Sequence, residues 1–232
     1  MDCSAKPDEP ESGSLAIGGA ARALHQVLLL QGAHEIRNQL AIILLQLGRI
    51  SDATARQMEG EVRTLSLTVE RMALLARMSS RIDTSMADLD LSTVVAETVA
   101  RCAGLPRLRS VRFEHIDRGG GVMRAHRISV SEAISCLVEN AYRHAPLGEH
   151  IIVTSGAGPI VTVDDGGPGL PARTLAELVA PFATGSTPGA GVGLGLTIAN
   201  QVACLHGGEL RAMRSPHGGT RMQLVFGLAN GP

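Results

Sequence analysis

The chain of 232 residues is long enough for two folded units, and 44% of its residues are hydrophobic. Its formal net charge is −1 and its 21 basic residues form no run, which argues against a nucleic-acid-binding surface or a patch for anionic membranes. The four cysteines stand far apart without a CxxC pair, so neither a zinc site nor a disulfide framework is indicated, and a reducing cytoplasm fits best. No apolar run approaches the roughly 18 residues of a membrane span, and the polar start is unlike a signal sequence.

Residues 1–13 are rich in Pro, Glu, Asp, Ser and Gly, a composition typical of a disordered tail. We expect folded structure to begin near Ser14, which leaves no room for a sensor domain before it. A signal would therefore reach this protein through a separate sensor protein or through a ligand.

Residues 14–85 are predicted to form a helical hairpin. Apolar residues recur at alternating steps of three and four over 29–50 and again over 58–76, the spacing of a helix stripe that packs against a partner. The segment "GRISDAT" separates the two stripes. Both are too wide for a two-helix contact, so we expect two hairpins to pair as a four-helix bundle in a homodimer.

Residues 86–232 alternate β-rich and helical runs, which predicts a two-layer α/β sandwich with a mixed sheet and an α+β fold for the whole chain. Three helices are expected between the strands. The predicted strands lie near residues 111–116, 150–155, 160–164, 208–214 and 220–227.

Two stretches of this second unit carry polar groups suited to a nucleotide. "LVENAYRHAP" places Asn140 on a helix with Arg143 one turn later, so that an amide oxygen could reach a metal ion and a cation could face a phosphate. "VDDGGPGLP" ends a strand with Asp165, whose carboxylate can accept a hydrogen bond from an exocyclic amine. Gly167 and Gly169 follow it and would let a ring approach the backbone.

Two further stretches follow in the chain. "APFATGS" supplies Phe182 at a loop. "GAGVGLGLTIAN" sets Gly191, Gly193 and Gly195 directly before a helix, which would aim backbone N–H groups and the helix N-terminus at phosphates. Taken singly, each of these stretches is more often an ordinary turn or a solvated helix residue.

In their order and spacing, the four stretches resemble the N, G1, F and G2 boxes of the histidine-kinase branch of the Bergerat-fold ATPases, the group that includes gyrase and Hsp90-type ATPase domains. The resemblance covers roughly residues 88–228 and extends to "HGGEL" at 206–210. It implies that the second unit binds ATP with Mg²⁺, and that Asn140 contacts the metal.

With such a domain behind it, "HEIRNQL" at residues 34–40 resembles the phosphoacceptor box of dimeric histidine kinases, H-E-x-[RK]-[TN]-P-[LM]. The stripe places Ile36 and Leu40 toward the bundle and leaves His34 on the accessible flank. Glu35 could polarise one imidazole N–H so that the other nitrogen attacks a γ-phosphate. Asn38 lies one turn after His34 and could orient a water, and the resemblance associates this position with dephosphorylation of the partner.

Three features depart from the family pattern. Gln39 stands where the box has Pro, so a helix kink there should be weak or absent. The lid segment "ATGSTPGA" at 183–190 contains no Lys or Arg. Cys136 lies one turn before Asn140, where histidine kinases usually carry Asn; it is either a small core residue or a thiol facing the site, which would slow autophosphorylation.

These features predict a soluble two-component histidine kinase that autophosphorylates His34 from ATP and passes the phosphoryl group to an Asp of a response regulator receiver domain, with phosphatase activity as a further expectation. One alternative is a histidine phosphotransferase or signalling scaffold with weak or no autokinase activity. Another is an anti-sigma-factor serine kinase, which would not need the hairpin bearing His34. A metal site of the HExxH type is excluded because position 38 is Asn.

Overall fold

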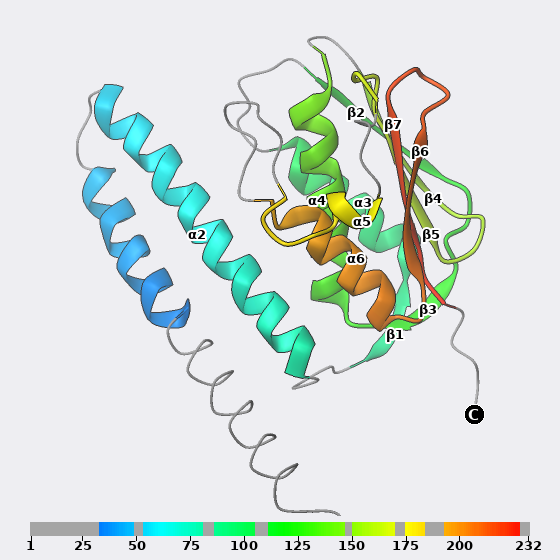
Figure 1. The fold of residues 1–232 in the computed structure, drawn as a ribbon, viewed down its shortest axis with the longest axis horizontal. Coiled ribbons are helices and arrows are strands. Elements are labelled where there is room, and N and C mark those ends of the chain that lie inside the picture. Colours follow the sequence, from blue (N-terminus) through cyan, green and yellow to red (C-terminus); the bar gives the residue numbers. More distant parts are fainter. Residues whose placement is uncertain are drawn as a thin grey trace, which may run out of the picture. The chain divides into compact units, whose positions relative to one another are not determined.

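The computed structural model describes residues 33–48, 53–80, 86–104, 111–146, 150–169, 175–183 and 193–227. The chain divides into two compact units, Met1–Ser80 and Arg81–Pro232, which are described separately below (Figure 1). The predicted tail at 1–13 and the predicted start of structure at Ser14 lie outside the described residues.

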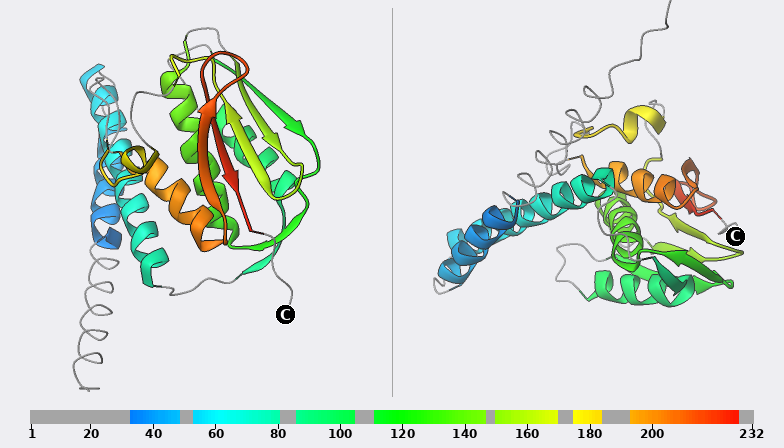
Figure 2. Two further views of the ribbon diagram at one scale, coloured as in Figure 1. Left: turned by 45° about the vertical axis from the view of Figure 1, so that its right-hand side comes forward. Right: turned by 90° about the horizontal axis from the view of Figure 1, so that it is seen from below.

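The first unit contains a helix over residues 33–47 and a longer helix, α2 (Ala53–Ser80). The two helices lie side by side as an antiparallel hairpin in Figures 1 and 2. Residues at alternate positions of each predicted apolar stripe pack as one cluster in the contact between the two helices. The predicted helical hairpin is therefore confirmed for the described residues. This cluster consists of Leu40, Leu47, Ala55 and Val62, with Leu44 and Val69 packed against it.

The other half of each apolar stripe remains exposed in the single chain. On the first helix, Ile36 is 51% and Ile43 is 40% exposed. On α2, Met58, Leu65 and Met72 recur at seven-residue intervals and are between 43% and 53% exposed. Ile36 and Leu40 were both predicted to face the bundle, but within one hairpin only Leu40 is buried. A second apolar face is left without cover.

The second unit is built on a five-stranded mixed sheet with the order β2-β4-β5-β7-β6. Strand β2 pairs with β4 in parallel, and the other pairs are antiparallel. This confirms the predicted mixed sheet. The strands are β2 (Arg112–Asp117), β4 (His150–Ser155), β5 (Ile160–Asp164), β6 (Glu209–Arg214) and β7 (Thr220–Val225).

Three helices cover one face of this sheet, as the predicted two layers require (Figure 2). They are α3 (Leu91–Ala103), α4 (Arg127–His144) and α6 (Gly195–Leu205). A further short helix, α5 (Leu175–Leu178), follows β5. The sequence did not predict the antiparallel pair β1 (Ala87–Asp90) and β3 (Val122–Ala125) beside α3. Strands of four residues are too short to show a clear alternating pattern.

Strand alternation separates an apolar face from a polar one. Val161 and Val163 of β5 are buried on the helix-covered side. Asp164 points to the opposite face, where both its carboxylate oxygens accept hydrogen bonds from the Arg221 guanidinium of β7, each at 2.8 Å. This bidentate pair joins residues that are direct neighbours in the ladder between β5 and β7.

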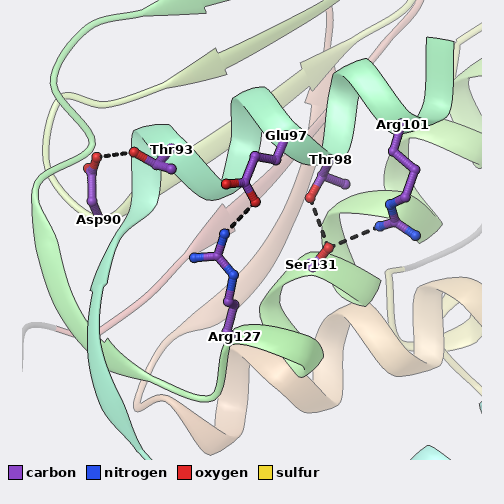
Figure 3. Close-up of polar contacts among 7 residues, drawn as sticks. All are labelled: Asp90, Thr93, Glu97, Thr98, Arg101, Arg127 and Ser131. Atoms are coloured by element: carbon purple, nitrogen blue, oxygen red, sulfur yellow. Dashed lines mark hydrogen bonds and ion pairs between the residues drawn. The ribbon is translucent and has the colours of Figure 1, made fainter. Parts of the chain in front are cut away.

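Polar side chains connect α3 to α4 (Figure 3). Glu97 of α3 forms an ion pair with Arg127 at the start of α4. One turn further along, the Arg101 guanidinium donates to the hydroxyls of Ser131 (3.0 Å) and Ser135 (2.9 Å). Because these two serines lie on successive turns, Arg101 fixes the register between the two helices.

His206, just after α6, connects three elements of the second unit. Its Nδ1 bonds to the Val202 carbonyl (2.7 Å), so Nδ1 carries the proton and Nε2 accepts from the backbone N–H of His126 (3.3 Å). The ring also meets Phe226 edge-on, with centroids 5.8 Å apart. Burial lowers the pKa of His206 below its ordinary value of 6.5; the bond to Val202 raises it and the neighbouring His126 lowers it.

We expect the free energy of unfolding to fall as the pH drops below about 6.5, the ordinary pKa of histidine. The unfolded chain then binds a proton at His206 that the folded chain excludes, and the loss is complete once the pH passes the lowered folded-state pKa. Urea denaturation followed by circular dichroism over this pH range measures the effect. His206→Gln, which keeps an acceptor for His126, should flatten the profile, whereas His217→Gln at an exposed turn should not. Equal profiles for His206→Gln and the parent would contradict this assignment.

Candidate functional site

Asp165, directly after β5, is the most strongly fixed of the predicted site residues. It is 3% exposed, and its Oδ1 accepts hydrogen bonds from the backbone N–H groups of Gly167 (2.8 Å) and Thr220 (3.0 Å). Its own N–H donates to the Thr220 carbonyl (2.9 Å). Among the described residues nothing bonds to Oδ2, so this oxygen can accept a hydrogen bond from a ligand.

Glycines bring the backbone close around this carboxylate. A Cβ on Gly167 would lie 2.8 Å from the His144 carbonyl oxygen and 2.9 Å from Asp165 Oδ1. A Cβ on Gly219 would lie only 2.4 Å from both Asp165 Oδ1 and the Gly167 nitrogen. Gly169 meets no close atom but has a φ of +86°, which side chains rarely adopt. We call this arrangement of Asp165, Gly167, Gly219 and Thr220 the Asp165 cradle. Any side chain at 167 or 219 would push its backbone segments apart.

Two features could receive the phosphates and the metal ion. Asn140 on α4 is partly exposed, and no hydrogen bond to its amide is recorded within the described part of the chain. Helix α6 begins at Gly195, and the side chain of the preceding Leu194 makes no capping bond. Uncapped first-turn N–H groups favour an anion. Among the described residues, no three His, Cys, Asp or Glu side chains gather into a metal site, so a Mg²⁺ would depend on Asn140 and on nucleotide oxygens.

The segments on either side of the predicted lid are joined by a backbone hydrogen bond. The N–H of Phe182 donates to the Gly193 carbonyl (3.1 Å), and Phe182 itself adopts a φ of 62° and is 57% exposed. A Cβ on Gly193 would lie 2.6 Å from the Ala183 carbonyl oxygen, so glycine is required there. Gly191 and residues 184–190 of the lid lie outside the described residues.

Cys136 lies on α4 and is buried against the start of α6. It is 2% exposed, its thiol donates to the Glu132 carboxylate (3.7 Å), and a Cβ added to Gly195 would lie 3.6 Å from the cysteine Cβ. This placement favours a packing role against the start of α6. Slow autophosphorylation caused by this thiol therefore stays a prediction without direct support. Arg143 is partly exposed on α4.

The predicted phosphoacceptor segment lies on the helix over residues 33–47, which continues through Gln39 without a break. His34, Glu35 and Asn38 are exposed, as a reacting group and its neighbours must be. Each of the charged neighbours has a local partner: Arg37 donates to His34 Nδ1 (2.8 Å), and Gln39 Nε2 donates to Glu35 (3.0 Å). Among the described residues, Glu35 bonds to Gln39, and no bond joins it to the imidazole that it was expected to polarise.

Sequence reasoning missed Gly219 and Thr220, which complete the Asp165 cradle from β7. The tetrapeptide "HGGT" at 217–220 carried the signal, since two glycines before a strand suggest a close backbone approach. Its meaning depended on Asp165, which lies 55 residues earlier in the chain.

Comparison with known proteins agrees with this geometry. Residues 125–230 match the family model described as histidine kinase-, DNA gyrase B- and HSP90-like ATPase. The chain is 27% identical over 196 residues to the sensor histidine kinase GtrS of Pseudomonas aeruginosa, and 30% identical over 218 residues to the sensor protein CutS of Streptomyces coelicolor. Most of the chain is thus similar in sequence to sensor histidine kinases. The predicted Bergerat-type ATPase fold of the second unit is thereby confirmed.

The chain spans only about half of the length of these relatives, or less. The alignments cover 83% and 84% of this chain but only 40% of GtrS and 50% of CutS. A solved structure, the histidine kinase AdeS of Acinetobacter baumannii, has the same fold with a TM-score of 0.61 and 20% identity, covering 88% of this chain and 96% of that one. Within the described part of the chain, none of the helices is long and apolar enough to cross a membrane.

We expect Asp165→Asn to weaken binding of Mg·ATP by about 1.5–3 kcal/mol, the range for a hydrogen bond to a charged group. The carboxylate would no longer offer a charged acceptor to the exocyclic amine of the base. Titration calorimetry with a non-hydrolysable analogue of ATP measures the change.

Gly219→Ala should weaken binding in the same assay, because its Cβ would collide with Asp165 Oδ1. The matched control is Gly60→Ala on α2, where an added Cβ meets nothing within 4 Å. Binding of the analogue by Asp165→Asn at the affinity of the parent would show that Asp165 does not hold adenine.

Proposed function

We propose that this chain is a two-component histidine kinase that transfers the γ-phosphoryl group of ATP to His34. The observation that carries the proposal is the Asp165 cradle, a buried carboxylate with one oxygen held by two backbone N–H groups and the other without a bond among the described residues. An exposed histidine followed by a carboxylate, on a helical hairpin of the same chain, supplies the acceptor.

In this proposal, separate residues bind the adenine base, the phosphates and the metal ion. Asp165 Oδ2 accepts from the amine of adenine, and Gly167 and Gly169 let the base lie against the backbone. The N-terminus of α6 faces the phosphates, with Arg143 as an added cation and Asn140 holding the metal. A bound Mg²⁺ supplies charge neutralisation on the phosphate oxygens.

The acceptor of the second transfer is an Asp on a response regulator receiver domain. Asn38 lies one turn after His34 on the exposed side of the helix, where its amide can orient a water toward the phosphorylated receiver. The chain would thereby act as a phosphatase as well as a kinase. We place these reactions in the cytoplasm, where ATP is available.

The rival function is a phosphotransferase or scaffold with weak or no autokinase activity. It is favoured by the local contacts of His34 and Glu35, which restrain both groups. It is disfavoured by the Asp165 carboxylate, whose Oδ2 has no bond among the described residues and is better explained by a ligand than by the fold alone.

Incubation with γ-labelled ATP should place an acid-labile, alkali-stable label on the chain, the behaviour of phosphohistidine. His34→Gln should abolish the label, and His217→Gln should leave it unchanged. Removal of Mg²⁺ with a chelator should stop labelling. An acid-stable label, or one that survives His34→Gln, would overturn the assignment of the acceptor.

Asn38→Ala should leave labelling of His34 intact and slow the loss of phosphate from a phosphorylated receiver domain by about 10- to 100-fold, the effect of removing one group that positions a reactant. The measurement follows the decay of labelled regulator with and without the kinase. A parallel loss of both activities would mean that Asn38 only supports the helix.

We further propose that the exposed face of the hairpin, Ile36, Ile43, Met58, Leu65 and Met72, pairs with the same face of a second copy. Leu65→Glu should raise the dimer dissociation constant by about 100-fold, since it removes an apolar contact worth about 1.5 kcal/mol on each of two subunits. Thr64→Glu, one residue off this face, is the control. A parent that sediments as a monomer at micromolar concentration would contradict the dimer.

A further inference from the structure

Arg37 favours one of the two neutral protonation states of His34. Its Nη2 lies 2.8 Å from His34 Nδ1, and the two residues are one helical turn apart. A guanidinium has only donors, so the contact requires a lone pair on Nδ1. In the neutral ring the proton is then on Nε2. Nδ1 is engaged by Arg37, and Nε2 has no lone pair with which to attack.

Gln39 binds the carboxylate of Glu35, which could otherwise favour the His34 ring protonated on Nδ1. Its side-chain amide donates to Glu35 Oε1 at 3.0 Å, across the i, i+4 spacing that makes helix neighbours. Glu35 is the neighbouring acceptor that could hold a proton on Nδ1 and thereby leave the Nε2 lone pair free. Proline at position 39 has no side-chain donor, so this contact depends on the departure from the family box.

We propose that Arg37 and Gln39 are positioning residues that hold His34 in a non-reactive tautomer, and that both contacts must be released before phosphoryl transfer. The inference deepens the proposed function and rests on it for the reaction itself. Exposed pairs within one helix shift an equilibrium by only about two- to fivefold, so both contacts can be released at little cost.

The step that follows release is balanced. The ring exchanges its Nε2 proton for one on Nδ1 through water, and Glu35 accepts a hydrogen bond from the new Nδ1–H. The Nε2 lone pair forms a bond to the γ-phosphorus of ATP, while the bond from that phosphorus to the β,γ-bridging oxygen breaks and its electrons leave on ADP. The Nδ1 proton passes to the Glu35 carboxylate, so the product ring is neutral.

The first test needs no ATP. Diethyl pyrocarbonate acylates an unprotonated imidazole nitrogen, and peptide mass spectrometry of the full chain reports its rate at His34. Arg37→Met, which keeps a good helix former but removes the donor, should raise this rate about two- to fivefold. Arg63→Met, at an exposed position of α2, should not change it. An unchanged rate in Arg37→Met, with helix content preserved, would overturn the role of Arg37.

The second test addresses Gln39 through Glu35. Nitrogen NMR of His34 should show a larger population protonated on Nδ1 in Gln39→Met than in the parent, and Glu35→Gln should cancel the increase. The initial rate of His34 labelling by ATP should rise about two- to fivefold in Gln39→Met, again only when Glu35 is present. An increase that survives Glu35→Gln, or no change in the NMR populations, would overturn the role of Gln39.

The two proposals fail separately. If no variant incorporates label from ATP while the acylation rate and the NMR populations shift as expected, the kinase assignment fails and the restraint on His34 stands. If labelling occurs at His34 but Arg37→Met and Gln39→Met leave the acylation and NMR signals unchanged, the restraint on His34 is wrong and the kinase assignment stands.

Discussion

The second unit depends on one buried carboxylate. Taking a carboxylate out of water is costly unless hydrogen bonds replace its hydration, and Asp165 obtains two of these from backbone N–H groups of separate segments. One of them, Thr220, begins β7 and also accepts from the Asp165 N–H. The same contacts that satisfy the carboxylate thus hold the end of β5 to the start of β7, and they leave room for no side chain at 167 or 219.

Two adjacent aspartates illustrate how strand geometry assigns separate tasks. Because successive side chains of a strand point to opposite faces, Asp164 is directed away from the helices and pairs with Arg221, whereas Asp165 is directed toward the turn of glycines. Asp164 has both oxygens occupied by a guanidinium. Asp165 has one oxygen without a bond among the described residues, so only the second residue of the pair is a candidate for ligand recognition.

The helix that carries His34, the proposed phosphoacceptor, has the opposite character. The Asp165 cradle is built from groups up to 55 residues apart and is buried. The recorded contacts of His34 and Glu35 are exposed and span only three or four residues of one helix. Such contacts rearrange at little cost. In the proposed kinase, a buried nucleotide site would be combined with an acceptor whose contacts are exposed, so that the state of the acceptor could control the reaction.

The local patterns of the sequence were sufficient to predict most of the helices and strands. Strands at 150–155 and 160–164 have the predicted bounds, because both lie in long β-rich runs. The order of the motifs led to the proposal of His34 as acceptor and of Asp165 and its glycines as a nucleotide site, and the spacing of apolar residues predicted the hairpin. Tertiary structure alone decided that Thr220 completes the cradle, that one half of each helical stripe stays exposed, and that β1 pairs with β3. The physical reason is that periodicity and motif order report what a segment prefers, whereas the partner of a backbone N–H or an apolar side chain depends on segments that are distant in the chain.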